Sequence, residues 1–120
     1  MAKFVCYDSN GVEVTCTDDN WDNHIVAEHP EIKGCEVHVK TTIEKPHRIY
    51  QDPRHPNTKI LYKPFILPKP FHTQWLRVAI EYRKPRFGNL RGYTLTAFAC
   101  TGVRKGDILI WEEGQDEKHK

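Results

Sequence analysis

The chain has 120 residues, 38% of them apolar and 28% charged, a composition that predicts one folded, soluble domain and argues against a disordered segment. No apolar run approaches the roughly 18 residues of a membrane span, and the start, MAKFVCYDSNG, lacks the apolar core of a signal peptide, so we expect a cytoplasmic protein. The net charge of +2 is too small to indicate nucleic-acid binding by itself.

The first elements in chain order are a hairpin and a helix. KFVCY and VEVTC are short β-type runs on either side of DSNG, a strong turn signal, so residues 1–16 predict an N-terminal hairpin. Thr17 or Asp18 can then cap a helix. This helix should end near His29, because the residue before a proline is disfavoured in the α region.

The next segment, residues 35–44, is ambiguous. Its sequence, CEVHVKTTIE, alternates between apolar and polar residues with a period of two, as a strand does. With a period of 3.6, one face of a helix would hold Cys35, Val39, Thr42 and Ile43. The pattern alone slightly favours the strand.

From residue 48 the signals turn to β. Runs rich in β-branched and aromatic residues predict four strands and a possible fifth, at residues 48–51, 59–63, 74–82, 92–100 and 108–111. Three prolines exclude regular structure from residues 64–73, yet this segment is apolar enough to pack back on the body as a lid or rim. The tail from residue 113 is expected to fray.

Together these elements predict an α+β fold, with residues 1–120 as a single domain. In it the N-terminal hairpin and the helices pack on a mostly antiparallel sheet of four to five strands. The four cysteines form no C-x-x-C pair, so we expect reduced structural thiols, no metal site and no cofactor.

Basic residues concentrate in the middle and later parts of the chain. RKPRFGNLR, residues 83–91, carries four cations and one aromatic ring, which suits a phosphate backbone with one base stacked on the ring. A solvated hairpin tip would have the same composition, so that interpretation stays open. The residues assigned to RNA binding share positive charge or an exposed ring: Arg48, Arg83, Lys84, Arg86, Phe87 and Arg91.

The helix around Trp21 carries two histidines. With Trp21 facing the core and ~100° per residue, His24 lies about 60° away on one flank and His29 about 80° away on the other. Both would sit at the boundary of core and surface, where a histidine can reach a substrate. The alternatives are an ordinary boundary histidine and a histidine favoured by the helix C-terminus. A zinc pair is disfavoured, because the spacing is five and not four.

Other enzyme signatures, such as a phosphate-binding glycine loop or a nucleophile elbow, are missing. The surplus of histidine, arginine, lysine, tyrosine and threonine suits metal-independent RNA cleavage, in which a 2′-hydroxyl attacks the neighbouring phosphate. That reaction needs an acid, a base and cations.

The order of motifs resembles the phage-associated branch of the barnase, EndoU, colicin and RelE nuclease superfamily. The series is DDNWDNHIVAEHPEI, VKTTIEKPHRIYQD, KILYK, WLRVAIEY and GYTLTAFA, within residues 15–100. The matching motifs of that branch correspond to His24-Ile25, His29-Pro30-Glu31, Pro46, Tyr62-Lys63 and Thr96-Ala97-Phe98. This chain departs from the branch in two places: Lys63 stands where arginine is usual, and Phe98 replaces a tyrosine.

The resemblance implies a second helix before Pro46, which overrules the strand interpretation of residues 35–44. It also implies a small endoribonuclease, toxin-like or phage-associated, with His24 as base or acid and His29 as second proton carrier or helix end. Lys63 and Arg54 would stabilise the transition state.

The same resemblance implies that Thr96 binds a phosphate oxygen. It also implies that Tyr62 packs, stacks or donates a proton. By alternation, Thr94, Thr96 and Phe98 would share a face, with Leu95 and Ala97 on the core side. Of the adjacent pair Tyr62 and Lys63, the lysine is then the one expected on the Thr96 face.

Two rival interpretations remain. A nuclease-like module that binds RNA or a protein without cutting would fit the changes at Lys63 and Phe98, and a metal-dependent nuclease is the weaker third possibility. The expected partner is RNA, and the resemblance implies a protein inhibitor such as an antitoxin or immunity protein. No membrane partner is expected, and the sequence leaves the oligomeric state open.

Overall fold

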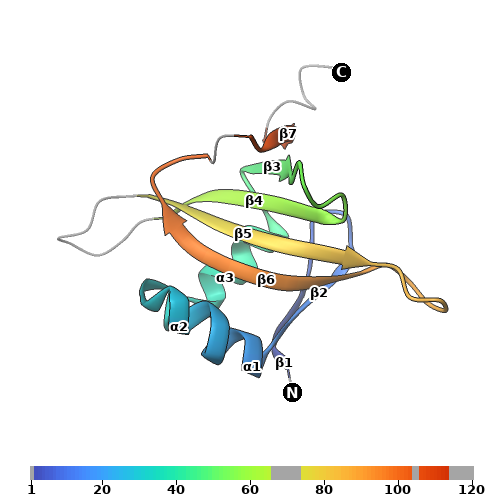
Figure 1. The fold of residues 1–120 in the computed structure, drawn as a ribbon, viewed down its shortest axis with the longest axis horizontal. Coiled ribbons are helices and arrows are strands. Elements are labelled where there is room, and N and C mark those ends of the chain that lie inside the picture. Colours follow the sequence, from blue (N-terminus) through green and yellow to red (C-terminus); the bar gives the residue numbers. More distant parts are fainter. Residues whose placement is uncertain (1, 66–73, 104–105, 114–120) are drawn as a thin grey trace.

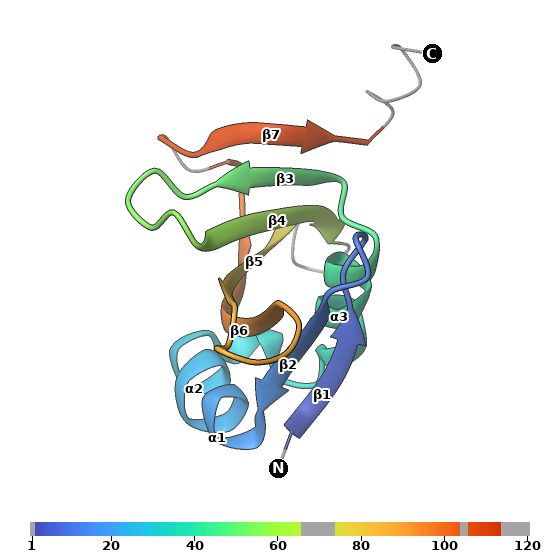
Figure 2. The same ribbon diagram turned by 90° about the vertical axis from the view of Figure 1, so that its right-hand side faces the viewer.

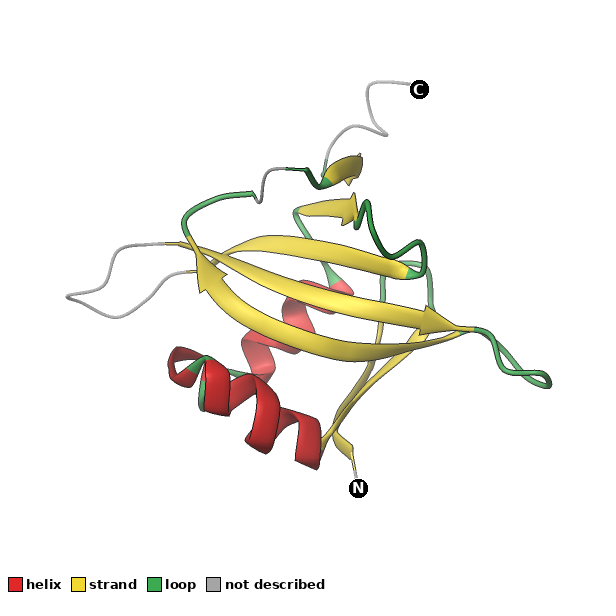
Figure 3. Cartoon of the chain, in the orientation of Figure 1, coloured by secondary structure: helices red, strands yellow, loops and turns green. Residues whose placement is uncertain are grey.

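The structure is a computed structural model that describes residues 2–65, 74–103 and 106–113. In this part of the chain one seven-stranded sheet carries helices on one of its faces (Figures 1 and 3). The strands are β1 Ala2–Tyr7, β2 Glu13–Thr17, β3 Arg48–Gln51, β4 Thr58–Phe65, β5 Gln74–Arg83, β6 Arg91–Cys100 and β7 Ile108–Glu112. The helical segments are α1 Asp18–Asn20, the π-helical turn η1 Trp21–Ile25, α2 Val26–Glu28, the 3-10 turn η2 Pro30–Ile32 and α3 Glu36–Glu44.

The strand order is β1-β2-β6-β5-β4-β3-β7, and every neighbouring pair is antiparallel except β2 and β6. The α+β class is confirmed, but the predicted sheet of four to five strands was wrong, because the sheet has seven strands. The N-terminal hairpin does not pack on the sheet as a separate unit; it extends the sheet through β2, while β7 extends the opposite edge beside β3 (Figure 2). Val14 and Cys16 of β2 are thereby buried.

The predicted N-terminal hairpin is confirmed. The carboxylate of Asp8 accepts the backbone N–H groups of Asn10 and Val12, each at 2.9 Å, and so holds the turn. Gly11 has a φ of 80°, in the left-handed region that favours glycine.

The first helical segment begins and ends as predicted. The Thr17 hydroxyl accepts the Asn20 N–H at 3.1 Å, as an N-cap does. His29 leaves the helical region, with φ −132° and ψ 75°, directly before Pro30. Between them the Val26 N–H donates to the Trp21 carbonyl, the i to i+5 bond of a π-helical turn.

Residues 35–44 lie almost wholly in the helix α3, which confirms the helix expected before Pro46; the strand interpretation drawn from their alternation was wrong. Val39, Thr42 and Ile43 are buried against the sheet. Spacings of three and four residues put these side chains on one face, and packing of that face on β1, β4 and β5 outweighs the local alternation.

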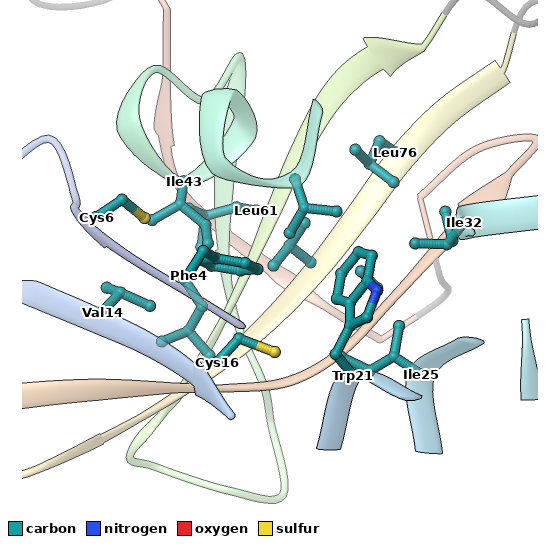
Figure 4. Packing of buried hydrophobic residues seen from close by; sticks show 14 residues of the cluster. Phe4, Cys6, Val14, Cys16, Trp21, Ile25, Ile32, Ile43, Leu61 and Leu76 are labelled. Carbon is teal, nitrogen blue, oxygen red and sulfur yellow. The ribbon is translucent and has the colours of Figure 1, made fainter. Parts of the chain in front are cut away.

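The main core lies between the helices and the sheet. Figure 4 shows Trp21 and Ile25 from the helix lying toward the side chains of Leu76 and Ile32. A second, smaller cluster lies on the opposite face of the sheet, and its buried members are Tyr50, Ile60, Tyr62 and Ala79. Both faces of the central strands are therefore covered by apolar packing.

Pro64 was placed in a loop but continues β4, opposite Trp75. Since β3 pairs with β4 only as far as Tyr62, the missing N–H of Pro64 interrupts no bond to β3 there. The lid or rim predicted within residues 64–73 falls, from residue 66 on, outside the described residues, as does the tail from residue 114. Among the described residues, no helix has the length and apolarity that a membrane crossing requires.

Candidate nucleic-acid interface

Three chain connections lie at one end of the sheet, which we call the hairpin end. They are the β1–β2 turn, the β3–β4 connection at residues 52–57 and the β5–β6 connection at residues 84–90. Strands β3 to β6 are joined as antiparallel neighbours, so alternate connections fall at the same end, and the parallel pairing of β2 with β6 brings the β1–β2 turn there too. The β5–β6 connection projects furthest from the sheet (Figure 1).

Five of the six residues predicted to bind RNA come together at this end. Phe87 is 85% exposed at the tip of the projecting connection, with the Arg86 guanidinium 5.7 Å from its ring centre. Arg83 lies 5.1 Å from the ring centre of Tyr93 and pairs with Glu81. The remaining two, Lys84 and Arg91, are exposed. The hairpin tip is therefore a solvated surface, as the simpler interpretation required, and also a compact basic and aromatic one.

The β3–β4 connection adds cations to this end. Arg54 is exposed, and its backbone N–H donates to the Asp52 carboxylate at 2.8 Å. Lys59, at the start of β4, places its ammonium 5.3 Å from the ring centre of Tyr82. The sequence assigned no role to Lys59. Lys59 comes near the basic end of β5 only through the pairing of β4 with β5. The sequence alone does not give this strand register, so it could not identify Lys59.

An open hollow of about 540 Å³ lies between these two connections. It is lined by Pro56, Asn57, Lys59, Tyr82, Arg83, Lys84 and Leu90, which include three cations. The Tyr82 hydroxyl donates to the Asp8 carboxylate at 2.7 Å, and burial together with this bond raises the pKa of Tyr82. Tyr82 therefore stays a neutral phenol in the wall of the hollow.

The opposite part of the sheet holds the other predicted residues. The register places Arg48, Tyr62, Arg77 and Phe98 side by side on β3 to β6. Thr96 lies opposite Ala79 and thus shares this face. Tyr62 is therefore the member of its pair on the Thr96 face, and the expectation of Lys63 there was wrong. Lys63 points to the helix-covered face, where its ammonium donates to the Lys45 carbonyl at 2.7 Å.

The expected alternation along β6 also breaks. The pairing with β5 shifts between Ala79 and Ile80, so that Leu95 has no direct partner. Such a bulge turns the following side chains by one position. Leu95 is consequently exposed and Thr94 buried, the reverse of the prediction, while Ala97 faces the core as expected.

Tyr62 takes part in a buried polar network. Its hydroxyl lies 3.3 Å from the Asp107 carboxylate and accepts a hydrogen bond from Arg77 Nε at 3.1 Å. Arg77 and Asp107 form an ion pair at 3.9 Å, and their side chains are only 6% and 4% exposed. Because Tyr62 is fully buried and Arg77 nearly so, this arrangement indicates a structural role for both.

The sixth predicted RNA-binding residue, Arg48, is separated from the hairpin end. Its Nε lies 3.6 Å from the Glu112 carboxylate and its guanidinium 5.2 Å from the ring centre of Trp75. A nearby histidine, His47, pairs with Glu113 at 2.9 Å. These two pairs fasten β7 to β3.

The two histidines of the first helical segment differ in their surroundings. His24 is 61% exposed, with Asp19 at 4.0 Å as its charged neighbour, because the wide π-helical turn moves it from the predicted boundary toward solvent. His29 is stacked on Phe98 with ring centres 4.7 Å apart, and its Nδ1 lies 4.0 Å from the Glu31 carboxylate. The structure joins His29 to Phe98 on the Thr96 face, and does not bring it near Arg54 at the hairpin end.

In the described residues, no group of three histidine, cysteine, aspartate or glutamate side chains is arranged to hold a metal ion. Comparisons of the chain with protein-family models, with curated proteins and with solved structures find no match. The nuclease resemblance therefore stays a prediction.

Proposed function

We propose that this protein binds single-stranded RNA through the hairpin end. The observation that carries the proposal is the 85% exposed Phe87 ring, with the Arg86 guanidinium beside it in a basic connection. Lys84, Arg86 and Arg91 lie in or beside this connection and are exposed. Arg54 in the β3–β4 connection and Lys59 at the start of β4 add two more cations.

Two physical effects support this choice. A phenylalanine ring that is 85% exposed contributes little to folding, but a base stacked on such a ring gains about 1–3 kcal/mol. Cations that need no partner in the folded protein are free to replace the counterions of a phosphate backbone, which makes binding strong at low salt and weak at high salt. The combination suits an unpaired strand, whose bases are open to stacking.

The test is the affinity for a fluorescently labelled single-stranded oligoribonucleotide, measured by anisotropy at several salt concentrations. Phe87→Ala should weaken binding by about tenfold, the loss of one stacked base. Val37→Ala is the matched control, because Val37 is also an exposed apolar side chain, 71% exposed, but lies on α3 away from the hairpin end. An unchanged affinity in Phe87→Ala, or no binding by the wild-type protein, would contradict the proposal.

A second candidate is the metal-independent endoribonuclease, and His29 is the observation that favours it. Its imidazole is partly exposed and stacked on Phe98, and its Nδ1 lies 4.0 Å from the Glu31 carboxylate, so its orientation is fixed. Cleavage of the same oligoribonucleotide in excess chelator, lost in His29→Ala and retained in His24→Ala, would establish this activity. Intact RNA at every pH would leave binding as the function.

A further inference from the structure

We propose that the hollow between the β3–β4 and β5–β6 connections is a site for a single nucleotide of the bound strand. Its phosphate would lie between Lys59 and Lys84, and its base would lie on Pro56 and Leu90. This inference rests on the proposed RNA binding and deepens it, since it names the residues that take the nucleotide beside the one stacked on Phe87.

The charges around the hollow are the first argument. Arg83 is committed to Glu81 and to the Tyr93 ring. By contrast, neither Lys59 nor Lys84 forms an ion pair with any carboxylate in the part of the chain that the structure describes. The Lys59 ammonium lies on the Tyr82 ring and Lys84 is exposed, so these two lysines without ion pairs line one hollow and can attract an anion.

The walls of the hollow are the second argument. Its volume of about 540 Å³ is in the range of small-molecule sites, and its lining combines the apolar Pro56 and Leu90 with the polar amide of Asn57. Phosphate alone would need cations only. Apolar side chains next to the cations fit the flat face of a base, and the Asn57 amide fits a base edge.

The hollow is also preformed. The Tyr82 N–H donates to the Asn57 carbonyl at 2.7 Å, which joins the β3–β4 connection to β5. Within that connection, the Gln51 side-chain amide donates to the carbonyl oxygens of His55 and Pro56, at 3.1 and 3.2 Å. Gln51 is therefore a positioning residue for this wall, and a ligand need not order the wall on binding.

The experiment uses adenosine 5′-monophosphate as the probe and isotope-labelled full-length protein. Its addition should shift the backbone amide resonances of Asn57, Lys59 and Leu90, and Lys59→Gln should weaken this binding by about tenfold, as expected when a charged hydrogen-bonding partner is lost. Lys84→Gln is a second variant that does not depend on β4 folding normally. Lys33→Gln, at an exposed lysine beyond the helical segment, is the matched control and should change nothing.

The outcomes separate this inference from the proposed function. Nucleotide-induced shifts confined to other residues, insensitivity to both lysine variants, or equal affinity for inorganic phosphate would overturn the nucleotide site. In each of those cases the RNA proposal would still stand if oligoribonucleotide binding depends on Phe87. If the wild-type protein binds no oligoribonucleotide, the RNA proposal fails first and this site is no longer one for a strand.

Discussion

The two ends of the sheet use the same residue types in opposite ways. At the hairpin end, Lys84 and Arg86 stand in solvent beside the exposed ring of Phe87. At the opposite end, on the Thr96 face, the Arg77 guanidinium lies 5.2 Å from the ring centre of Phe98 but is buried and paired with Asp107. The sequence alone does not distinguish these two groups, because both combine cations with an aromatic ring.

The difference teaches that the partner of a cation determines its use. Burying a guanidinium without compensation costs several kcal/mol, so Arg77 must keep its carboxylate and can offer little to a ligand. A cation exposed to water needs no carboxylate partner. The hairpin end is thus a part of the described surface where clustered positive charge is available for binding.

The largest expected effect comes from breaking the buried pair. Asp107→Asn leaves Arg77 with an unpaired charge at 6% exposure, and we expect the free energy of unfolding to fall by about 3–5 kcal/mol. Urea denaturation followed by circular dichroism measures this. The control is Asp19→Asn, at a carboxylate that is 77% exposed, which should change stability by less than about 0.5 kcal/mol. Equal effects of the two variants would remove the contrast between the two ends.

A smaller effect is expected at the base of the projecting connection. A Cβ added at Gly92 would meet methyl groups of Ile80 and Val14 at 3.0 Å, so Gly92→Ala overpacks the core and should cost about 1–3 kcal/mol. Gly102→Ala is the control, because nothing lies within 4 Å of its added Cβ. A neutral Gly92→Ala in the same urea titration would mean that the base is as loosely packed as the tip.

Two buried thiols, Cys6 and Cys16, make the stability of the fold depend on pH. Burial raises the pKa of Cys6 from 9.0 to about 11 and that of Cys16 from 9.0 to about 12. Above pH 9 the unfolded chain loses thiol protons that the folded chain keeps, so stability should fall as pH rises from 9 toward 12. Urea midpoints at about pH 8 and about pH 10.5 measure the loss, and Cys16→Ala should reduce it. A midpoint independent of pH in this window would contradict the burial of both thiols.

Much of the fold could be predicted because its signals are local. The turn at DSNG, the Thr17 cap, the proline after His29 and the runs of β-forming residues each depend on neighbours in sequence. Residues 35–44 show the limit, since alternation and helical periodicity coexist there and only packing on the sheet decides between them.

The candidate site was less predictable, because it depends on register. A single bulge at Leu95 changed which side chains of β6 share a face, and no residue in the sequence marks it. The partners of Tyr62 and Lys59 likewise come from strands far along the chain. Composition identified the basic segment 83–91 correctly as a cluster, because a hairpin tip keeps neighbours in sequence close in space.

The smallest effect on stability is expected at Arg86, a residue for which we predict a measurable effect on RNA binding. Arg86→Gln removes an exposed cation, so the free energy of unfolding should change by less than about 0.5 kcal/mol. In the anisotropy assay the same variant should lower the slope of log affinity against log salt by about 0.7, the value for one phosphate contact on a single strand. Lys33→Gln should leave the slope unchanged. A lower stability with an unaltered slope would mean that Arg86, like Arg77, is engaged within the fold, and the two ends of the sheet would then differ only in exposure.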